Sequence, residues 1–251
     1  MLELFHGPTL AFKDFGARFM ARTMSHFLQD SDEVVNILVA TSGDTGSAVA
    51  SGFYGVEGVN VYLLYPSGKV SDIQEMQLTT FDKNIIALEI DGTFDDCQAL
   101  VKSAFVDDDI NSKIKLSSAN SINIARLIPQ SFYFFNAYKE LKDKSKDVYI
   151  SVPSGNLGNL TAGLLAKKMG LPIKKFIGAT NSNSVFTEFI ASGKYEPRSS
   201  VKTLSNAMDV GAPSNLNRIQ TLYDDHSIVL KDITSNTHND NPTVEKIKEN
   251  L

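Results

Sequence analysis

Short apolar runs rich in β-branched residues recur along the chain and constrain its fold more than any other feature. They read VVNILVA (34–40), VNVYLLY (59–65), NIIALEI (84–90), DVYISVP (147–153) and KKFIGAT (174–180). Continuous apolar runs of this length are typical of strands buried on both faces of a sheet. Because stretches of helical periodicity separate them, the pattern predicts repeated βαβ units and a mostly parallel sheet, hence an α/β fold.

The stretches between these runs predict helices, several of which follow a Ser, Thr or Asn that can cap them. The predicted helices cover residues 14–28, 46–54, 72–80, 94–106, 122–142, 157–169 and 184–192. Pro129 predicts a kink or an early stop in the longest of them, and a last amphipathic helix is expected from Pro242. The polar segment 107–121 has no clear period and predicts a crossing between domains.

Charge and cysteine content exclude several classes of protein. A net charge of −5, with acids and lysines interleaved, gives no basic stripe for nucleic acid. Cys97 is the only cysteine, so we expect no disulfide framework and a reducing, cytoplasmic compartment. No apolar run reaches the roughly 20 residues of a membrane helix. The histidines show no metal-ligand spacing and no Gly-x-Ser-x-Gly elbow occurs, so metal hydrolysis and triad chemistry are disfavoured.

Two glycine-containing loops follow predicted strands and precede predicted helices. In SVPSGNLGNLT the loop holds Gly155 and Gly158, and in ATSGDTGSAVA it runs from Ser42 to Ser47. Such a turn points backbone N–H groups at an anion, and the helix N-terminus adds partial positive charge. Neither loop matches a dinucleotide or nucleoside-triphosphate motif. The alternatives are an ordinary strand-to-helix turn for the first loop and, for Asp44, a simple helix cap.

Two further stretches hold single candidate residues. In SSANSINIARLIPQ (117–130), Asn120, Asn123 and Arg126 are spaced by three and share a face if they are helical, which suits phosphate binding; a solvated arginine is the more common outcome. Lys13, in AFKDFG, is by local sequence alone a surface charge. It becomes a reactive amine only if it is desolvated, for which Phe12 and Phe15 offer an apolar wall.

Taken together, ordered blocks along the whole chain resemble those of threonine synthase. The blocks are FHGPTLAFKDFGARFMA, ATSGDTGSAVA, SSANSINIARLIPQ, SVPSGNLGNLTAGLLAKKMGLP and NAMDVGAPSNLNRI. That family has the fold type II of pyridoxal-phosphate enzymes. The resemblance implies two open, mostly parallel sheets with helices on both faces and a cofactor cleft between domains. It divides the chain into a lysine-bearing segment (1–28), a smaller α/β domain (29–118) and part of a larger one (119–251).

The resemblance also implies roles for particular residues. Lys13 matches the lysine that forms the Schiff base with pyridoxal 5′-phosphate. The cofactor phosphate maps to the glycine loop of SVPSGNLGNLT, at Gly155, Asn156, Leu157, Gly158 and Asn159. The loop that faces the substrate carboxylate and the pyridine ring maps to Ser42, Gly43, Asp44 and Thr45. The substrate phosphate maps to Asn120 and Arg126, with Lys69 of YPSGKVSDIQ as a further member of the charge cluster.

The implied reaction converts O-phospho-L-homoserine and water to L-threonine and phosphate, with a small molecule as the only partner. Family members also carry sequence before the lysine block and after the end of this chain, so a truncated protein is expected. Two alternatives stay open: another fold type II lyase, such as a hydroxy-amino-acid dehydratase, and an inactive homologue that only binds a ligand. No oligomeric state is implied.

Overall fold

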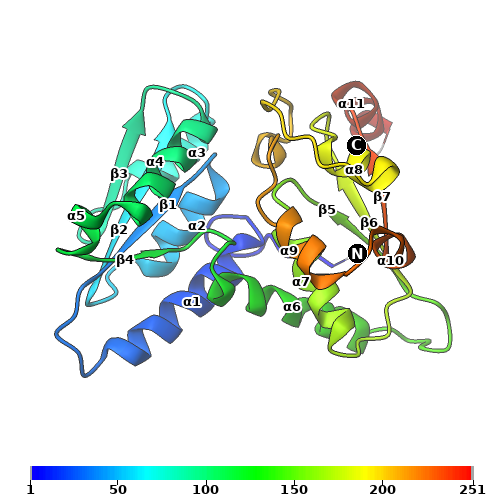
Figure 1. The fold of residues 1–251 in the computed structure, drawn as a ribbon, viewed down its shortest axis with the longest axis horizontal. Helices are drawn as coiled ribbons and strands as arrows, with labels where there is room; N and C mark the ends of the chain where they lie inside the picture. The colour runs from blue at the N-terminus through cyan, green and yellow to red at the C-terminus, as the bar shows by residue number, and fades with distance from the viewer. Residues whose placement is uncertain (1, 250–251) are drawn as a thin grey trace. The chain divides into compact units, whose positions relative to one another are not determined.

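Two parallel sheets organise the chain in this computed structural model, which describes residues 2–249 (Figure 1). The chain divides into two compact units, 1–129 and 130–251. The sequence-based boundary between residues 118 and 119 falls earlier, ahead of Asn120 and Arg126, which belong to the first unit. The long helix α6 (Ile124–Lys139) continues from one unit into the next.

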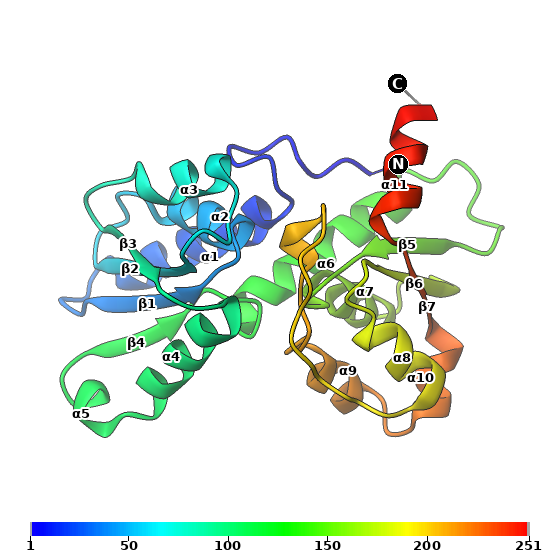
Figure 2. The same cartoon turned by 90° about the horizontal axis from the view of Figure 1, so that it is seen from above.

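The first unit is built on a parallel sheet with the strand order β3-β2-β1-β4. Its strands are β1 (Val35–Ala40), β2 (Val59–Pro66), β3 (Ile85–Ile90) and β4 (Lys115–Ser118). Its helices are α1 (Lys13–Leu28), α2 (Asp44–Phe53), α3 (Asp72–Thr79), α4 (Phe94–Val106) and α5 (Asp108–Asn111). In Figure 2, α1 to α3 lie on one side of the sheet and α4 and α5 on the other.

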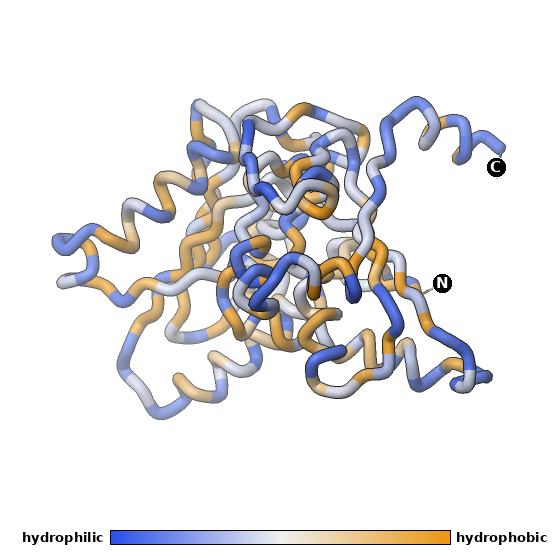
Figure 3. Tube along the Cα trace, turned by 45° about the vertical axis from the view of Figure 1, so that its right-hand side comes forward, coloured by the Kyte–Doolittle hydropathy of each residue, from blue (hydrophilic) through white to orange (hydrophobic). Residues whose placement is uncertain are grey.

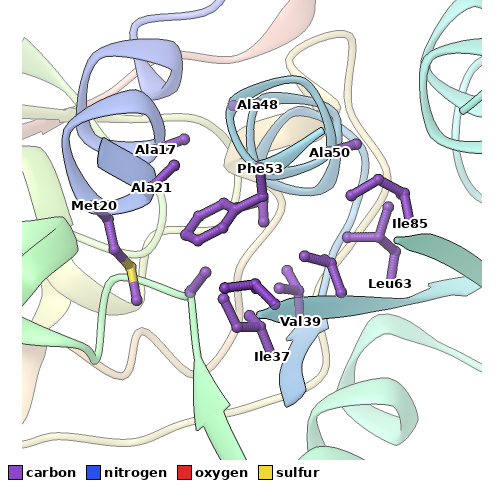
Figure 4. Close-up of a cluster of buried hydrophobic side chains, with 14 of the residues drawn as sticks. Ala17, Met20, Ala21, Ile37, Val39, Ala48, Ala50, Phe53, Leu63 and Ile85 are labelled. Atoms are coloured by element: carbon purple, nitrogen blue, oxygen red, sulfur yellow. The ribbon is translucent and has the colours of Figure 1, made fainter. Parts of the chain in front are cut away.

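Successive side chains of β1 serve opposite faces of this sheet, as the pleat requires. Ile37 and Val39 join the cluster formed with α1 and α2, where Figure 4 shows Phe53 directed between α1 and the strand. The opposite face buries Ala40 against Cys97 of α4. Burial on both faces explains the continuous apolar runs seen in the sequence. The Cys97 thiol is fully buried, and this burial raises its pKa to about 11.

The second unit has a parallel sheet with the order β5-β6-β7. Its strands are β5 (Tyr149–Pro153), β6 (Lys175–Thr180) and β7 (Ile233–Thr237). Its other elements are α7 (Gly158–Lys168), α8 (Val185–Ser192), the short 3-10 helix η1 (Asn206–Met208), α9 (Leu216–Leu222), α10 (His226–Asp232) and α11 (Asp240–Glu249). Helices α7, α8 and α10 pack against this sheet. Helix α11 buries no side chain and is mostly hydrophilic (Figure 3).

The predicted α/β class with two open parallel sheets is confirmed, and every predicted strand and helix occurs to within a few residues. Strands β4 and β7 were missed, since KLSS and ITSNT carry too few apolar residues to be read as strands. Of the kink or early stop expected at Pro129, the early stop was wrong, and the kink stays a prediction. Helix α6 continues to Lys139, because Leu127 before the proline and Phe134 after it are both buried, and this packing outweighs the lost backbone hydrogen bond.

Over the part of the chain that is described, none of the helices has the length and apolar character needed to cross a membrane.

Candidate functional site

Lys13 is the first residue of α1, directly after a turn that is fixed by its neighbour Asp14. Asp14 is 4% exposed, and its carboxylate accepts hydrogen bonds from Thr9 N, at 3.0 Å, and Thr9 Oγ1, at 2.6 Å. Gly7 belongs to the same turn, where a Cβ would overlap the Asp14 side chain. The GPTLAFKD block therefore encodes a rigid platform for Lys13.

The Lys13 side chain is only 17% exposed, and its Nζ lies 3.9 Å from Asp44 Oδ2. Burial lowers the pKa of the Lys13 amine; the nearby Asp44 opposes this shift, and the positive charge of Arg126 adds to it. The centroid of the Phe12 ring lies 6.0 Å from Nζ, whereas Phe15 is 45% exposed. Lys13 is thus placed as a desolvated amine and not as a surface charge.

The loop between β1 and α2 presents Asp44 to Lys13. Thr41, which is fully buried, accepts hydrogen bonds on Oγ1 from Gly43 N, at 3.0 Å, and Gly46 N, at 2.8 Å. Gly43 is the N-cap of α2 and has a φ of +128°, which favours glycine. Asp44 is the first helical residue and caps nothing, so the simple-cap interpretation was wrong. Ser42, in this loop, and Thr45, the second residue of α2, are half-buried.

Asn120 and Asn123 lie in the turn before α6 and not on its face, because the helix begins only at Ile124. Asn120 Nδ2 donates to Ala40 O at 2.8 Å, and its Oδ1 accepts from Ala40 N at 3.3 Å. Asn120 therefore pairs with the last residue of β1 where the β1–β4 ladder stops. Asn123 Nδ2 donates to Ser118 O at 2.8 Å, which fixes the turn. The prediction of one helical face for these two asparagines and Arg126 was wrong.

Arg126 is 2% exposed, so the solvated-arginine alternative was also wrong. Its Nη1 donates to Ala119 O at 2.7 Å, inside the same turn. Lys69 differs, since it is exposed in the turn that follows β2. The first unit thus brings Lys13, Asp44 and Arg126 together as interacting charges, while Lys69 stays at the surface.

The loop at 155–159 follows β5 in the second unit. Leu157 is the N-cap of α7 and has a φ of +61°, a left-handed conformation that is uncommon for leucine. Its side chain is fully buried, and Leu157 O accepts from Thr161 N at 2.8 Å and from Thr161 Oγ1 at 2.7 Å. The first N–H groups of a helix have no intrahelical partner and carry partial positive charge. Gly158 and Asn159 begin α7, so this end of the helix suits an anion.

Residues far along the sequence clamp this loop. Asn156 Oδ1 accepts hydrogen bonds from Ser214 N, at 2.7 Å, and Ser214 Oγ, at 3.0 Å, while Asn215 Nδ2 donates to Asn156 O at 2.9 Å. A Cβ on Gly155 would lie 2.7 Å from Met208 backbone atoms. The loop is therefore set by close contact with the 208–215 segment.

Sequence reasoning missed the residues that hold these loops. Thr41 lies inside the quoted ATSGDTGSAVA stretch, one residue before Ser42, and its hydroxyl is a known local turn signal. Ser214 and Asn215 lie inside the NAMDVGAPSNLNRI block, but no local signal connects them to Asn156. Gln74, whose Nε2 donates to Asp44 Oδ1 at 2.8 Å, was also missed, although a Ser-x-x-Gln spacing from Ser71 is a known capping signal.

Curated relatives and solved structures resemble this chain in sequence and fold. The chain is 52% identical to the threonine synthase of Buchnera aphidicola subsp. Schizaphis graminum and 50% identical to that of Escherichia coli, over 98% and 99% of its length. It superposes on the crystal structure of the Escherichia coli threonine synthase with a TM-score of 0.91 and 48% identity, covering 99% of this chain. A PLP-bound threonine synthase from Brucella melitensis gives a TM-score of 0.83 at 38% identity, covering 95% of this chain and 57% of that one.

The chain spans 58% of the length of each of the Buchnera and Escherichia coli proteins. A maize serine racemase, at 17% identity and a TM-score of 0.67 over 95% of this chain and 65% of that one, shares the fold alone. The pattern of the family described as "Pyridoxal-phosphate dependent enzyme" matches residues 1–234. Since this match covers nearly all of the sequence, the chain belongs to the pyridoxal-phosphate dependent enzyme family.

Proposed function

We propose that this chain carries the chemistry of a threonine synthase, which converts O-phospho-L-homoserine and water to L-threonine and phosphate. The observation that carries the proposal is the placement of Lys13. Its desolvated amine lies beside Asp44 and under the field of Arg126, in the block that matches the family's cofactor-bonding lysine. The curated relatives that share about half of their aligned residues with this chain are threonine synthases, which supports the same reaction here.

Two segments, each taken by itself, suit one functional group of pyridoxal phosphate. A covalent bond to its aldehyde needs a neutral amine, and burial shifts the pKa of Lys13 in that direction. A phosphate dianion needs several N–H donors, and we assign it to residues 155–159 at the N-terminus of α7. When bound, the cofactor ring accepts the electron pair left at the substrate Cα.

The protein side of the reaction follows from these placements. With cofactor and substrate bound, the Lys13 amine would hold and move protons at the substrate Cα and Cβ. Ser42, Gly43 and Thr45 bind the substrate carboxylate with loop N–H and hydroxyl groups, and Asp44 faces the pyridine ring and the lysine. The buried Arg126 binds the leaving phosphate, because a guanidinium gives paired charge-assisted hydrogen bonds. Asn120 and Lys69 complete this phosphate site in the proposal.

Borohydride reduction after incubation with pyridoxal phosphate tests the role of Lys13. We expect the reduced cofactor on the Lys13 peptide and no label in Lys13→Ala. The exposed Lys139 serves as an internal control for non-specific labelling, and equal label on Lys139 and Lys13 would overturn the assignment. Absence of any label would favour the inactive-homologue alternative.

Phosphate release from O-phospho-L-homoserine, together with threonine formation, tests the reaction itself. Arg126→Ala should lose roughly 2–5 kcal/mol of substrate binding or turnover, because a buried charged partner is removed, while the cofactor chromophore survives. Arg126→Lys should recover only part of the loss, because an ammonium cannot bind a phosphate bidentately. Deamination of serine or threonine without phosphate release would instead establish the dehydratase alternative.

A further inference from the structure

Gln74 takes part in an ordinary helix-capping motif through the oxygen of its side-chain carboxamide. Ser71 is the N-cap of α3, and its Oγ accepts from Gln74 N at 3.3 Å. In return Gln74 Oε1 accepts from Ser71 N at 3.0 Å and from Ser71 Oγ at 3.1 Å. This reciprocal pair is a complete capping box, and it engages only the oxygen of the carboxamide.

The nitrogen of the same carboxamide leaves the cap and reaches the β1–α2 loop. Gln74 Nε2 donates to Asp44 Oδ1 at 2.8 Å, and the Gln74 residue is 8% exposed. The carboxamide lies directly against Gly43, where a Cβ would overlap it. Gly43 is thus required both for its φ of +128° and for the close approach of Gln74.

We propose that Gln74 is a positioning residue that orients the Asp44 carboxylate toward Lys13. Asp44 Oδ1 accepts the hydrogen bond from Gln74, and the other carboxylate oxygen, Oδ2, lies 3.9 Å from Lys13 Nζ. The inference rests on the proposed role of Lys13, because the orientation matters only if that amine reacts.

The chemistry of an amide explains why glutamine suits this position. The Asp44 side chain is 31% exposed, so without a fixed partner water competes for Oδ1 and the carboxylate turns away from the lysine. A lysine or arginine at position 74 would also bind Asp44, but its positive charge would compete with that of Lys13 for the carboxylate. A carboxamide holds one oxygen as a neutral donor and leaves the field of the carboxylate directed at Lys13.

The pKa of Lys13 in the cofactor-free chain tests this inference separately from cofactor binding and turnover. It is read from the pH dependence of trace acetylation of the Lys13 peptide by mass spectrometry. Lys139 and Lys146, whose side chains are 79% and 80% exposed, are reference amines in the same digest. The charged groups that act on Lys13 are Asp44 of α2, which raises its pKa, and Arg126 of α6, which lowers it.

Gln74→Met keeps the length of the side chain and removes the donor, so we expect the pKa of Lys13 to fall by about half a unit to one unit. Ser71→Ala is the matched control, because it breaks the capping box but keeps the Gln74–Asp44 hydrogen bond, and its Lys13 pKa should equal that of the parent. An unchanged value in Gln74→Met, or an equal fall in Ser71→Ala, would overturn the proposal.

A double-mutant cycle with Asp44→Asn completes the test. Asp44→Asn alone should lower the pKa of Lys13 by about one unit or more, and adding Gln74→Met should lower it no further, since Gln74 acts only through Asp44. An additional fall in the double variant would contradict that route. Gln74→Ala, which places a strong helix former in α3, repeats the measurement if the methionine variant folds poorly.

Discussion

The two glycine-containing loops, one after β1 and one after β5, share a sequence pattern but are stabilised in different ways. The first reaches its left-handed φ with Gly43 and is held from within by Thr41. The second reaches it with Leu157 and is held from the 208–215 segment through Asn156 and Gly155. The backbone turn of the first loop is therefore held by a neighbouring residue, although Gln74 contacts the loop from 30 positions away, whereas the second loop is held by residues 58 and 59 positions from Asn156.

This difference has an energetic side. A non-glycine residue in the left-handed region costs on the order of 1 kcal/mol, which glycine avoids. Leu157 offsets the cost by burying its whole side chain and by accepting two hydrogen bonds from Thr161. The second loop is thus a strained conformation held by tertiary contacts, and damage to those contacts should affect it more than equivalent changes affect the first loop.

Gly155→Val should give the largest effect, because its Cβ would collide with Met208 backbone atoms. We expect pyridoxal phosphate affinity to fall by well over tenfold, measured by absorbance titration, while affinity for pyridoxal, which has no phosphate, changes much less. Gly55→Asn is the matched control, since that site has a positive φ, open space around it and lies in the first unit. Equal losses for both ligands would show that the phosphate sits elsewhere.

Gly43→Ala should act on the first loop, since it strains a φ of +128° and displaces Gln74. We expect a loss of about 1–3 kcal/mol in the free energy of unfolding, measured by urea denaturation. Because the first loop lies in the other unit from residues 155–159, phosphate-dependent affinity should change far less than in Gly155→Val. A variant as stable as the parent would contradict the close approach of Gln74.

Asn156→Ala and Thr41→Val remove one acceptor from each loop and compare the two directly. Each leaves two donor groups without their partner, so each should cost about 1–3 kcal/mol of stability. Only Asn156→Ala should also weaken binding of pyridoxal phosphate relative to pyridoxal. The same ligand selectivity in Thr41→Val would erase the distinction between the loops.

The smallest expected effect is a pH dependence of stability. It should arise from Lys13, which lies beside Asp44, and not from the second loop. The folded state lowers the pKa of this amine below the ordinary value of about 10.4, so between the two values the unfolded chain binds more protons. Stability relative to Lys13→Met should therefore rise as the pH increases through this window, and should be at its lowest below the folded pKa. Urea midpoints from pH 7 to 10 measure it, with the exposed Lys69→Met as control; parallel profiles for parent and Lys13→Met would contradict it.

The sequence reveals the sheets and the position of both loops because their signals are local: apolar runs, glycines and capping residues. It does not reveal β4, whose KLSS carries no run of its own and pairs beside β1. Nor does it reveal that Asn120 bonds the backbone of Ala40, 80 residues earlier. The resemblance located Lys13 and Arg126, but the burial of both follows only from packing. The missed supports, Gln74 and Ser214, act across long separations that spacing cannot show.

The buried Cys97 thiol can report how often the first unit opens locally. As the only thiol in the chain, fully enclosed between α4 and the sheet and with its pKa raised to about 11, it can meet an alkylating reagent at neutral pH only while α4 is detached. The rate of its modification, followed by intact mass, therefore measures how often α4 detaches within residues 1–129. It gives no information about the second unit. This single thiol thus reports the local dynamics of the first unit separately from those of the rest of the chain.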